Sequence, residues 1–322
     1  MIGRRASLAM TGLKLKQKAP RNKTIELDAR EVNSLAKKSL KLLTKVSLDF
    51  VINQVIHQDA LQAIDNIPAE SVDLMIVDPP YNLTKNFASK TFKEMDLDEY
   101  KKWLDKWMKK TVRILKKDAC IYICSDWKTS IAIPEIASKY FLIQNRITWE
   151  REKGRGASNN WKNCIEDIWF CTLGKEYKFN LDDVKMQRPV IAPYRDEKGN
   201  PKDWVDDGKN KIRLTHPSNL WTDISIPFWS MAENTSHPTQ KPEKLIAKLI
   251  LASSDEGDVV FDPFLGSGTT AVVAKKLGRN YIGIEREKEY VALSVKRLEI
   301  ADKDKTIQGY EDGIFRARIG ER

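Results

Sequence analysis

The hydrophobic pattern of this sequence alternates between two periods, most clearly toward the two ends of the chain. Short β-branched apolar runs predict buried strands, at residues 71–77, 119–124, 141–149, 259–261 and 281–284, and residues 48–58 are apolar and rich in strand-forming residues. Apolar residues spaced three or four positions apart predict helices, at residues 26–45, 97–116, 130–139, 242–252, 269–277 and 288–300. Strands that alternate with helices predict an α/β fold with a mostly parallel central sheet.

The regular pattern is interrupted in the middle of the chain. Residues 151–234 are rich in Asn, Gly, Pro, Trp and charge, and their apolar residues have no steady period. We therefore expect an inserted region there rather than core. The residues after about 301 are polar, and we expect them to form a frayed tail.

Charge changes this picture at the amino-terminal end. The chain has 322 residues and a formal net charge of +10, and residues 1–45 account for nine of those ten charges. A basic arm on a nearly neutral body predicts a flexible segment that faces a polyanion such as DNA. Two alternatives stay open, a solubilising tail and, because the first twenty residues contain Arg and Ser but no acid, a transit peptide.

Other classes of protein fit the composition poorly. The longest apolar stretch, at 245–252, contains Lys248 and is far shorter than the roughly 18 residues of a membrane helix, so we expect no membrane association. The four cysteines lack the two-residue spacing of a zinc knuckle. We therefore expect reduced thiols in a cytoplasmic protein, and no metal.

A glycine-rich turn follows one of the predicted strands. In the segment FDPFLGSGTT (261–270), Gly266 and Gly268 allow the backbone to approach a ligand where a Cβ would clash. The next predicted strand leads to Glu285, whose carboxylate is placed to accept hydrogen bonds from both ribose hydroxyls of an adenosine. The third glycine of a dinucleotide site and the Gly-Lys-Ser/Thr of a P-loop are both absent. The turn therefore predicts an adenosine site without a pyrophosphate.

A second motif, Asp78-Pro79-Pro80-Tyr81, follows the predicted strand at 71–77, at the end where open α/β sheets bind ligands. The two prolines carry no amide donor, so acceptors dominate, namely the Asp78 carboxylate and the Pro79 carbonyl. This pair suits an exocyclic NH₂ group, because it takes both hydrogens and leaves the nitrogen lone pair free to attack. Tyr81 offers a face on which a heteroaromatic ring can stack. The alternative is an ordinary turn.

Together these motifs resemble those of the amino-group DNA methyltransferases that use S-adenosylmethionine. Residues 78–81 match the family's catalytic D-P-P-Y, residues 262–270 match its cofactor loop, and residues 236–242 (SHPTQKP) look like a further cofactor-side motif. The catalytic motif comes first, an order similar to the circularly permuted β group. The similarity spans about residues 50–300, and at residues 150–170 it looks closest to bacterial restriction-modification methylases of the RsrI kind.

The resemblance implies a Rossmann-like methyltransferase fold with helices on both faces of the sheet. It divides the chain into a basic arm and helix (1–45), a catalytic half (46–150), a target recognition region (151–234), a cofactor-binding half (235–300) and a polar tail (301–322). The implied catalytic residues are Asp78, Pro79, Pro80 and Tyr81. The implied cofactor residues are Asp59 at the adenine amino group, His237, Pro238 and Thr239 at the methionine end, Phe264, Glu285 at the ribose, and Asp262, Gly266, Ser267, Gly268 and Thr269 in the loop. No metal is implied.

In that family an Asp at the first motif position accompanies adenine methylation. The resemblance therefore implies a site-specific enzyme that methylates adenine N6 in double-stranded DNA after base flipping. It hints at an EcoRI-type site, GAATTC, and at a separate restriction endonuclease that acts alongside. We expect DNA contacts from Arg146, Arg151, Lys153, Arg155, Asn160 and Lys162. A solvated loop over a core fits this stretch equally well, and a monomer and a homodimer both stay open.

Three other functions remain as alternatives. The first is a methyltransferase that acts on cytosine N4 or on RNA. The second is a catalytically silent, DNA-binding methylase-like subunit, but intact Asp78, Tyr81, Gly266, Gly268 and Glu285 speak against it. The third is a nicotinamide oxidoreductase, which the missing third glycine disfavours.

Overall fold

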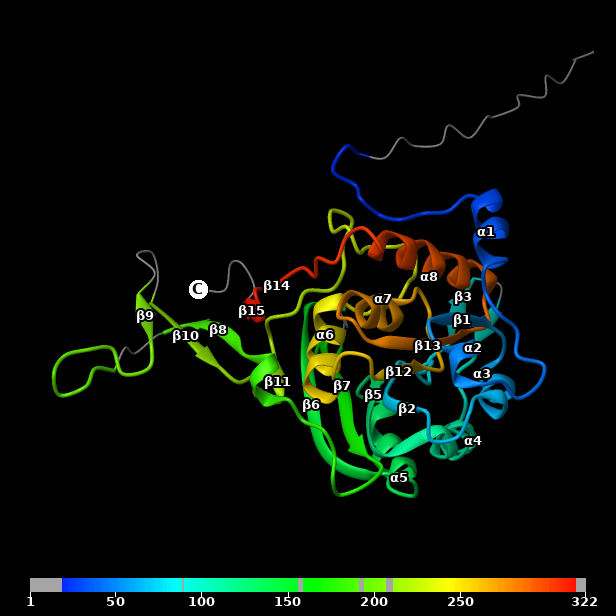
Figure 1. Cartoon of the computed structure of the whole chain (residues 1–322), viewed down its shortest axis with the longest axis horizontal. Coiled ribbons are helices and arrows are strands. Elements are labelled where there is room, and N and C mark those ends of the chain that lie inside the picture. Colours follow the sequence, from blue (N-terminus) through cyan, green and yellow to red (C-terminus); the bar gives the residue numbers. More distant parts are fainter. Residues whose placement is uncertain (1–18, 89, 156–158, 191–193, 207–210, 317–322) are drawn as a thin grey trace, which may run out of the picture.

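An eight-stranded sheet runs through the middle of the molecule in the computed structural model, which describes residues 19–88, 90–155, 159–190, 194–206 and 211–316 (Figure 1). In spatial order its strands are β1 (Gln54–His57), β13 (Asn280–Glu285), β12 (Val259–Asp262), β2 (Val72–Val77), β5 (Leu115–Ser125), β7 (Asn163–Thr172), β6 (Leu142–Arg155) and β11 (Leu220–Trp221). The first five are parallel to one another, β7 is antiparallel to β5 and β6, and β11 is parallel to β6. The predicted α/β fold with a mostly parallel sheet is confirmed.

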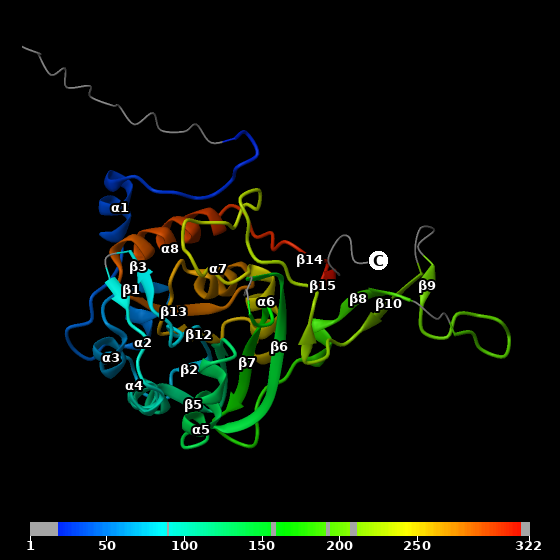
Figure 2. The same cartoon turned by 180° about the vertical axis from the view of Figure 1, so that it is seen from behind.

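Helices cover both faces of this sheet (Figures 1 and 2). One face carries α1 (Ala29–Ala36), α6 (Glu243–Ser253), α7 (Thr269–Lys276) and α8 (Lys288–Ala301). The other face carries α2 (Leu48–Val51), α3 (Ala60–Ala63), α4 (Leu97–Thr111) and α5 (Ile133–Ala137). Short 3₁₀ turns occupy Ile64–Asn66, Val112–Ile114, Thr129–Ile131 and Leu181–Val184. Among the helices of the described residues, none is long and apolar enough to cross a membrane.

The strands divide the apolar interior into two cores, one on each face. Along β2, Leu74 and Ile76 pack into the core under α6, α7 and α8, whereas Met75 and Val77 pack into the core under α3 and α4. Successive side chains of a strand point to opposite faces, so a strand buried on both faces reads as an unbroken apolar run. This is why 71–77 was recognisable as a strand from the sequence.

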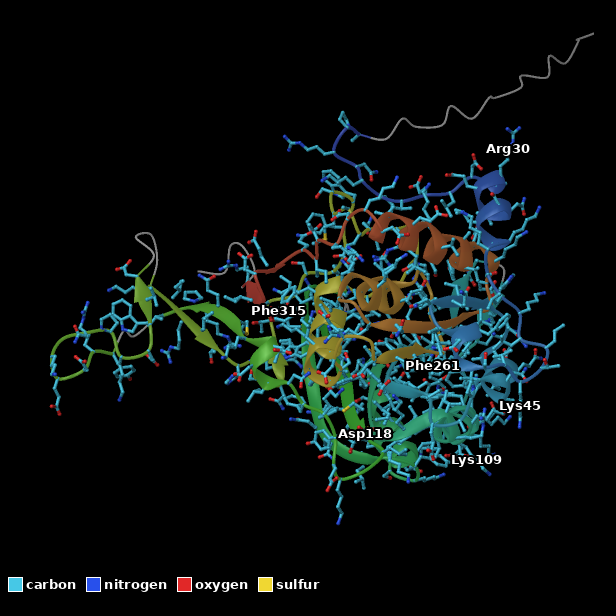
Figure 3. All side chains as sticks on the ribbon, viewed as in Figure 1. Arg30, Lys45, Lys109, Asp118, Phe261 and Phe315 are labelled. Atoms are coloured by element: carbon cyan, nitrogen blue, oxygen red, sulfur yellow. The ribbon has the colours of Figure 1, made fainter. Side chains whose placement is uncertain are left out.

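A second, smaller sheet projects from the core (Figure 1). Its spatial order is β14 (Tyr310–Glu311), β15 (Ile314–Arg316), β8 (Met186–Pro189), β10 (Lys211–Thr215) and β9 (Val205–Asp206). A separate hairpin pairs β3 (Lys85–Phe87) with β4 (Lys90–Phe92). Figure 3 labels Phe315 at the base of the projecting sheet, where its side chain is fully buried. The expected frayed tail is therefore wrong for residues 310–316, because Phe315 and the pairing of β15 with β8 fix them to the fold.

The predicted recognition region, 151–234, does not coincide with one structural unit. Its first residue falls inside β6, and β7 within it is an interior strand of the central sheet. Acidic side chains at Glu166 and Asp167 interrupt the apolar run of β7, which hides this strand from a hydrophobicity pattern. The part that leaves the core is the projecting hairpin of β8, β9 and β10 (Figure 2).

The amino-terminal segment also differs from expectation. The predicted helix at 26–45 is confined to α1, which Asp28 caps by accepting hydrogen bonds from the amides of Arg30 and Glu31. Beyond α1 the chain pairs with β1 instead, since Leu40 bridges Ile56. Residues 19–45 are thus packed on the domain rather than extended as a free arm. The rest of the predicted arm, 1–18, lies outside the described residues.

Candidate active site

Three acidic side chains follow neighbouring parallel strands at the same edge of the central sheet. Asp78 comes directly after β2, Asp262 ends β12 and Glu285 ends β13. Because β12 pairs in parallel with both β2 and β13, the three carboxylates reach one edge. The two motifs that are far apart in the sequence therefore meet there, as expected for ligand sites in open α/β sheets.

A cavity of about 460 Å³ opens at this edge, a size typical of small-molecule sites. All four predicted catalytic residues line it, Asp78, Pro79, Pro80 and Tyr81. Of the predicted cofactor residues, Asp59, His237, Pro238, Thr239, Asp262, Phe264, Gly266, Ser267, Thr269 and Glu285 line it as well. Gly268 is outside the lining. Within the described part of the chain, no cluster of three or more His, Cys, Asp or Glu side chains is placed to hold a metal ion.

The glycine-rich turn needs its two glycines for different reasons. Both have positive φ angles, +56° at Gly266 and +87° at Gly268. A Cβ on Gly266 would lie 3.1 Å from His237 Nε2, in the cavity wall, whereas a Cβ on Gly268 would lie 2.8 Å from the Cα of Ser294 in α8. Gly266 therefore shapes the cavity, and Gly268 allows the turn to pack on α8.

Glu285 closes the turn from the neighbouring strand. Its Oε2 accepts a hydrogen bond from the Gly266 amide at 2.8 Å, and its Oε1 accepts one from the Glu287 amide at 2.7 Å. Burial raises the pKa of Glu285 to about 7, although these backbone hydrogen bonds oppose the shift. A carboxylate oxygen has two lone pairs, so each oxygen keeps acceptor capacity toward the cavity.

Asp262 braces the same turn from within. Its Oδ1 accepts a hydrogen bond from the Phe264 amide at 2.9 Å, and its Oδ2 accepts one from the Thr270 hydroxyl at 2.7 Å. Burial raises the pKa of Asp262 to about 7, against these two hydrogen bonds. Its side chain thus holds the loop between β12 and the first turn of α7.

One wall of the cavity is aromatic. The Phe264 ring packs against Trp103 and Trp107 of α4, with ring centres 5.6 Å and 5.8 Å apart. Trp107 is fully buried from solvent, yet both tryptophans line the cavity. Asp59 lies at the amino end of α3, where it accepts a hydrogen bond from the Leu61 amide at 2.9 Å.

His237 presents a neutral imidazole to the cavity. Burial lowers its pKa to about 3, and the charges of Lys241 and Lys85 act in the same direction. The Thr239 amide donates to its Nδ1 at 3.3 Å, and its ring lies edge-on to Tyr290, with centres 4.3 Å apart. Its position in the structure is therefore fixed by packing rather than by an ion pair.

A buried network of charges surrounds the second motif. The Lys241 ammonium lies 2.6 Å from Asp78 Oδ2 and 3.3 Å from Glu166 Oε2. The Tyr81 hydroxyl donates to Glu166 Oε2 at 3.0 Å, and Arg151 Nη1 lies 3.0 Å from Glu166 Oε1. Two cations and two anions are thus paired in one wall of the cavity.

Burial and charge oppose each other in this network. Burial raises the pKa of Asp78 above its usual range, although Lys241 opposes the shift. Burial disfavours the charged form of Lys241, but the carboxylates of Asp78 and Glu166 outweigh it and raise the Lys241 pKa. Asp78 Oδ1 is buried and accepts no hydrogen bond from the described residues. One acceptor thus remains available inside a largely paired site.

The predicted DNA contacts are more dispersed. Among those whose side chains the structure describes, only Arg151 lines the cavity. Arg146 is exposed, lies 3.8 Å from Asp167 and stacks over the Trp169 ring at 5.9 Å. The others lie further along the β6–β7 hairpin: Asn160 and Lys162 are exposed, and Lys153 and Arg155 belong to β6 with side chains outside the described part.

Lys241 and Glu166 were not predicted as site residues. Lys241 stands in the SHPTQKP string that was singled out, but nothing in that string shows which carboxylates it would face. Glu166 carried no signal, because the strand that brings it to the cavity was itself not predicted.

Comparisons with known proteins assign this architecture to a family. Residues 72–296 match the family model described as DNA methylase. The chain is 37% identical to the DNA adenine methyltransferase YhdJ of Escherichia coli (strain K12), over 77% of this chain and 83% of the relative. It is 35% identical to the type II methyltransferase M.HpaI of Haemophilus parainfluenzae, over 76% of this chain and 74% of the relative.

The fold is shared with solved methyltransferases as well. The PvuII DNA methyltransferase (cytosine-N4-specific) superposes with a TM-score of 0.56 at 20% identity, covering 78% of this chain and 90% of the other. The family match, the two relatives and the shared fold lead to one conclusion: this chain belongs to the DNA methylase family of amino-type methyltransferases.

Proposed function

We propose that this protein transfers a methyl group from S-adenosylmethionine to adenine N6 in double-stranded DNA, after flipping the adenine out of the helix. The observation that carries the proposal is that the Asp78–Tyr81 motif and the Gly266 turn with Glu285 line one cavity. A methyl transfer needs its two reactants side by side, and alignment of this kind is a large part of such catalysis.

The residues around the turn fit S-adenosylmethionine. The space beside Gly266 is one that a Cβ would fill, and Glu285 there keeps acceptor capacity for ribose hydroxyls. Asp59 would take the adenine amino group, Phe264 would pack on the cofactor, and neutral His237 would line the methionine end. When bound, S-adenosylmethionine supplies an electrophilic methyl group on its sulfonium sulfur.

The second motif fits the amino group of a flipped base. Asp78 Oδ1, which accepts no hydrogen bond from the described residues, would accept one amino hydrogen, and the Pro79 carbonyl would accept the other. These contacts orient the amino group and leave its lone pair free for the methyl carbon. Tyr81 would stack on the base, and its hydroxyl is already fixed by Glu166. This stacking would help to offset the few kcal/mol that flipping costs.

Adenine is the preferred target because Asp stands at position 78 and because the relative YhdJ is named as an adenine methyltransferase. Cytosine N4 is the second candidate for the methylated atom, because an enzyme with the same fold is named as cytosine-N4-specific. M.HpaI is named as a type II methyltransferase, which supports a modification enzyme that works alongside a separate restriction endonuclease. The proposed place of action is the cytoplasm. GAATTC is retained as the proposed site, with Arg151 and the exposed basic residues of the β6–β7 hairpin on the DNA side.

The test is methyl transfer from labelled S-adenosylmethionine to unmethylated genomic DNA, followed by nucleoside analysis and mapping of the modified positions. We expect N6-methyladenine at one short motif. N4-methylcytosine as the product, or label in RNA alone, would replace the adenine assignment. Cofactor binding without any transfer would favour a silent DNA-binding subunit.

A further inference from the structure

Lys241 contacts two of the groups that the target base would use. Its ammonium lies 2.6 Å from Asp78 Oδ2 and 5.2 Å from the centre of the Tyr81 ring. The side chain is 8% exposed and belongs to the cavity lining. A base that stacks on Tyr81 and donates its amino group to Asp78 therefore comes within reach of this ammonium.

The two oxygens of the Asp78 carboxylate have different surroundings. Oδ2 is held by Lys241, whereas Oδ1 is buried and accepts no hydrogen bond from the described residues. An amino group that binds Oδ1 brings the adjacent edge of its ring alongside Oδ2, where the ammonium lies. Lys241 therefore does not have to leave for the base to enter.

The Lys241 ammonium also has an N–H donor that the two carboxylates do not use. A lysine ammonium carries three donors; Asp78 Oδ2 accepts one at 2.6 Å, and the Glu166 carboxylate, 3.3 Å away, engages at most one more. Glu166 further holds the Tyr81 hydroxyl, so one carboxylate fixes both the stacking ring and the cation. The Lys241 ammonium and the Tyr81 ring are thus fixed relative to each other before a base binds.

Resting on the proposed function, we propose that Lys241 recognises the flipped adenine by donating its third hydrogen to N1, the ring nitrogen beside the amino group. Flipped bases are commonly read on this Watson–Crick edge. The amino lone pair of adenine is delocalised into the ring, so N1 is the more nucleophilic nitrogen. A hydrogen bond from Lys241 occupies the N1 lone pair and leaves the amino nitrogen as the acceptor of the methyl group.

Base analogues test this contact in the intact enzyme. Duplexes that carry adenine, 1-deazaadenine or 7-deazaadenine at the target position are compared, each opposite an abasic site so that base pairing does not differ. We expect kcat/KM for 1-deazaadenine to fall about tenfold to a hundredfold, which is what the loss of one hydrogen bond from a charged donor costs. 7-Deazaadenine, which keeps N1 and the amino group, should stay within about twofold of adenine.

Two matched variants then assign the effect to Lys241. In Lys241→Met the difference between adenine and 1-deazaadenine should disappear. Lys248→Met should keep that difference, because Lys248 is another buried lysine paired with a carboxylate, Asp223 at 2.8 Å, but lies outside the cavity lining. If Lys241→Met does not fold, the analogue ratio of the wild-type enzyme still decides.

Each contrary outcome has its own meaning. Equal rates for adenine and 1-deazaadenine, loss of rate with 7-deazaadenine, or discrimination that persists in Lys241→Met would overturn the contact. A wild-type enzyme that leaves ordinary adenine unmethylated would instead contradict the proposed function on which the contact rests.

Discussion

The Nε2 atom of His237 lies 3.1 Å from the point where a Cβ on Gly266 would begin. The SHPTQKP string and the glycine-rich turn are therefore packed so closely that an added Cβ would require the imidazole to shift by a few tenths of an ångström. The neighbouring Gly268 is constrained by backbone instead, since its Cβ would meet the Cα of Ser294 at 2.8 Å. A ring can move aside more easily than a helix backbone.

This contrast predicts different defects for two small substitutions. Gly266→Ala should weaken binding of S-adenosylmethionine about tenfold or more, at a cost to the fold of about 1–2 kcal/mol for an alanine at positive φ. Gly268→Ala should mainly lower the melting temperature, because α8 has to shift. Calorimetric titration with the cofactor and thermal unfolding measure the two effects, and equal defects in both variants would contradict this division.

Removing the charge of Asp78 should separate turnover from cofactor binding. In Asp78→Asn we expect turnover to fall by a factor of about 10²–10³, as for other preorganised polar groups at a reacting centre. The affinity for S-adenosylmethionine should stay within about threefold. Asp167→Asn is the matched control, since Asp167 lies on β7 outside the cavity lining and bonds the Ser130 hydroxyl at 2.8 Å. If Asp78→Asn turns over at nearly the wild-type rate, the charge of Asp78 has no role in the reaction.

Cofactor affinity should depend on pH through Glu285. Its pKa in the empty site is about 7, and only the ionised carboxylate can accept from both ribose hydroxyls with both oxygens at full, charge-assisted strength. Protons therefore compete with the ligand, and the affinity should fall about tenfold for each pH unit below 7 and level off above it. Titration calorimetry in buffers of different ionisation enthalpy should show proton release on binding near pH 6.5. An affinity that is constant from pH 6 to 8 would exclude this role for Glu285.

The projecting sheet should loosen when its buried anchor is removed. Phe315→Ala removes a fully buried ring that contacts Tyr310 and lies 5.4 Å from the Lys248 ammonium, so we expect a local cost of about 3–5 kcal/mol. Amide exchange should accelerate in β8 and β10, and DNA binding should weaken, while S-adenosylmethionine binding is retained. Val205→Ala, at a residue that is 65% exposed on β9, should change neither exchange nor melting. If the amides of β8 exchange as slowly in Phe315→Ala as in the wild type, Phe315 does not anchor the projecting sheet.

Much of the core could be predicted from the sequence because its elements carry their own pattern. The strand at 71–77 and the helix at 288–300 are recognisable from their local hydrophobic periodicity. The structure has them as β2 and α8, with bounds that differ by one residue. The Gly266 turn and Asp78 were recognisable because each follows such a strand directly. Their meeting in one cavity followed from the rule that parallel strands present their carboxyl ends at one edge.

The elements that were missed depend on distant partners. β7 carries Glu166 and Asp167 inside an interior strand, which becomes tolerable only because Lys241, Arg151 and Ser130 lie opposite them. The strand at Ile314–Arg316 likewise has no pattern of its own, since β8 and not local periodicity orders it. Charge pairing and strand addition across long stretches of chain leave little trace in a hydrophobicity pattern.

The pairing of β15 with β8 also sets an order of assembly during protein synthesis. β8 leaves the ribosome well before α6, α7 and α8, but its neighbour β15 is made only after all three. The α/β core can thus be complete while one side of β8 still lacks a partner. A nascent chain would acquire its methyltransferase cavity first and the finished projecting sheet last.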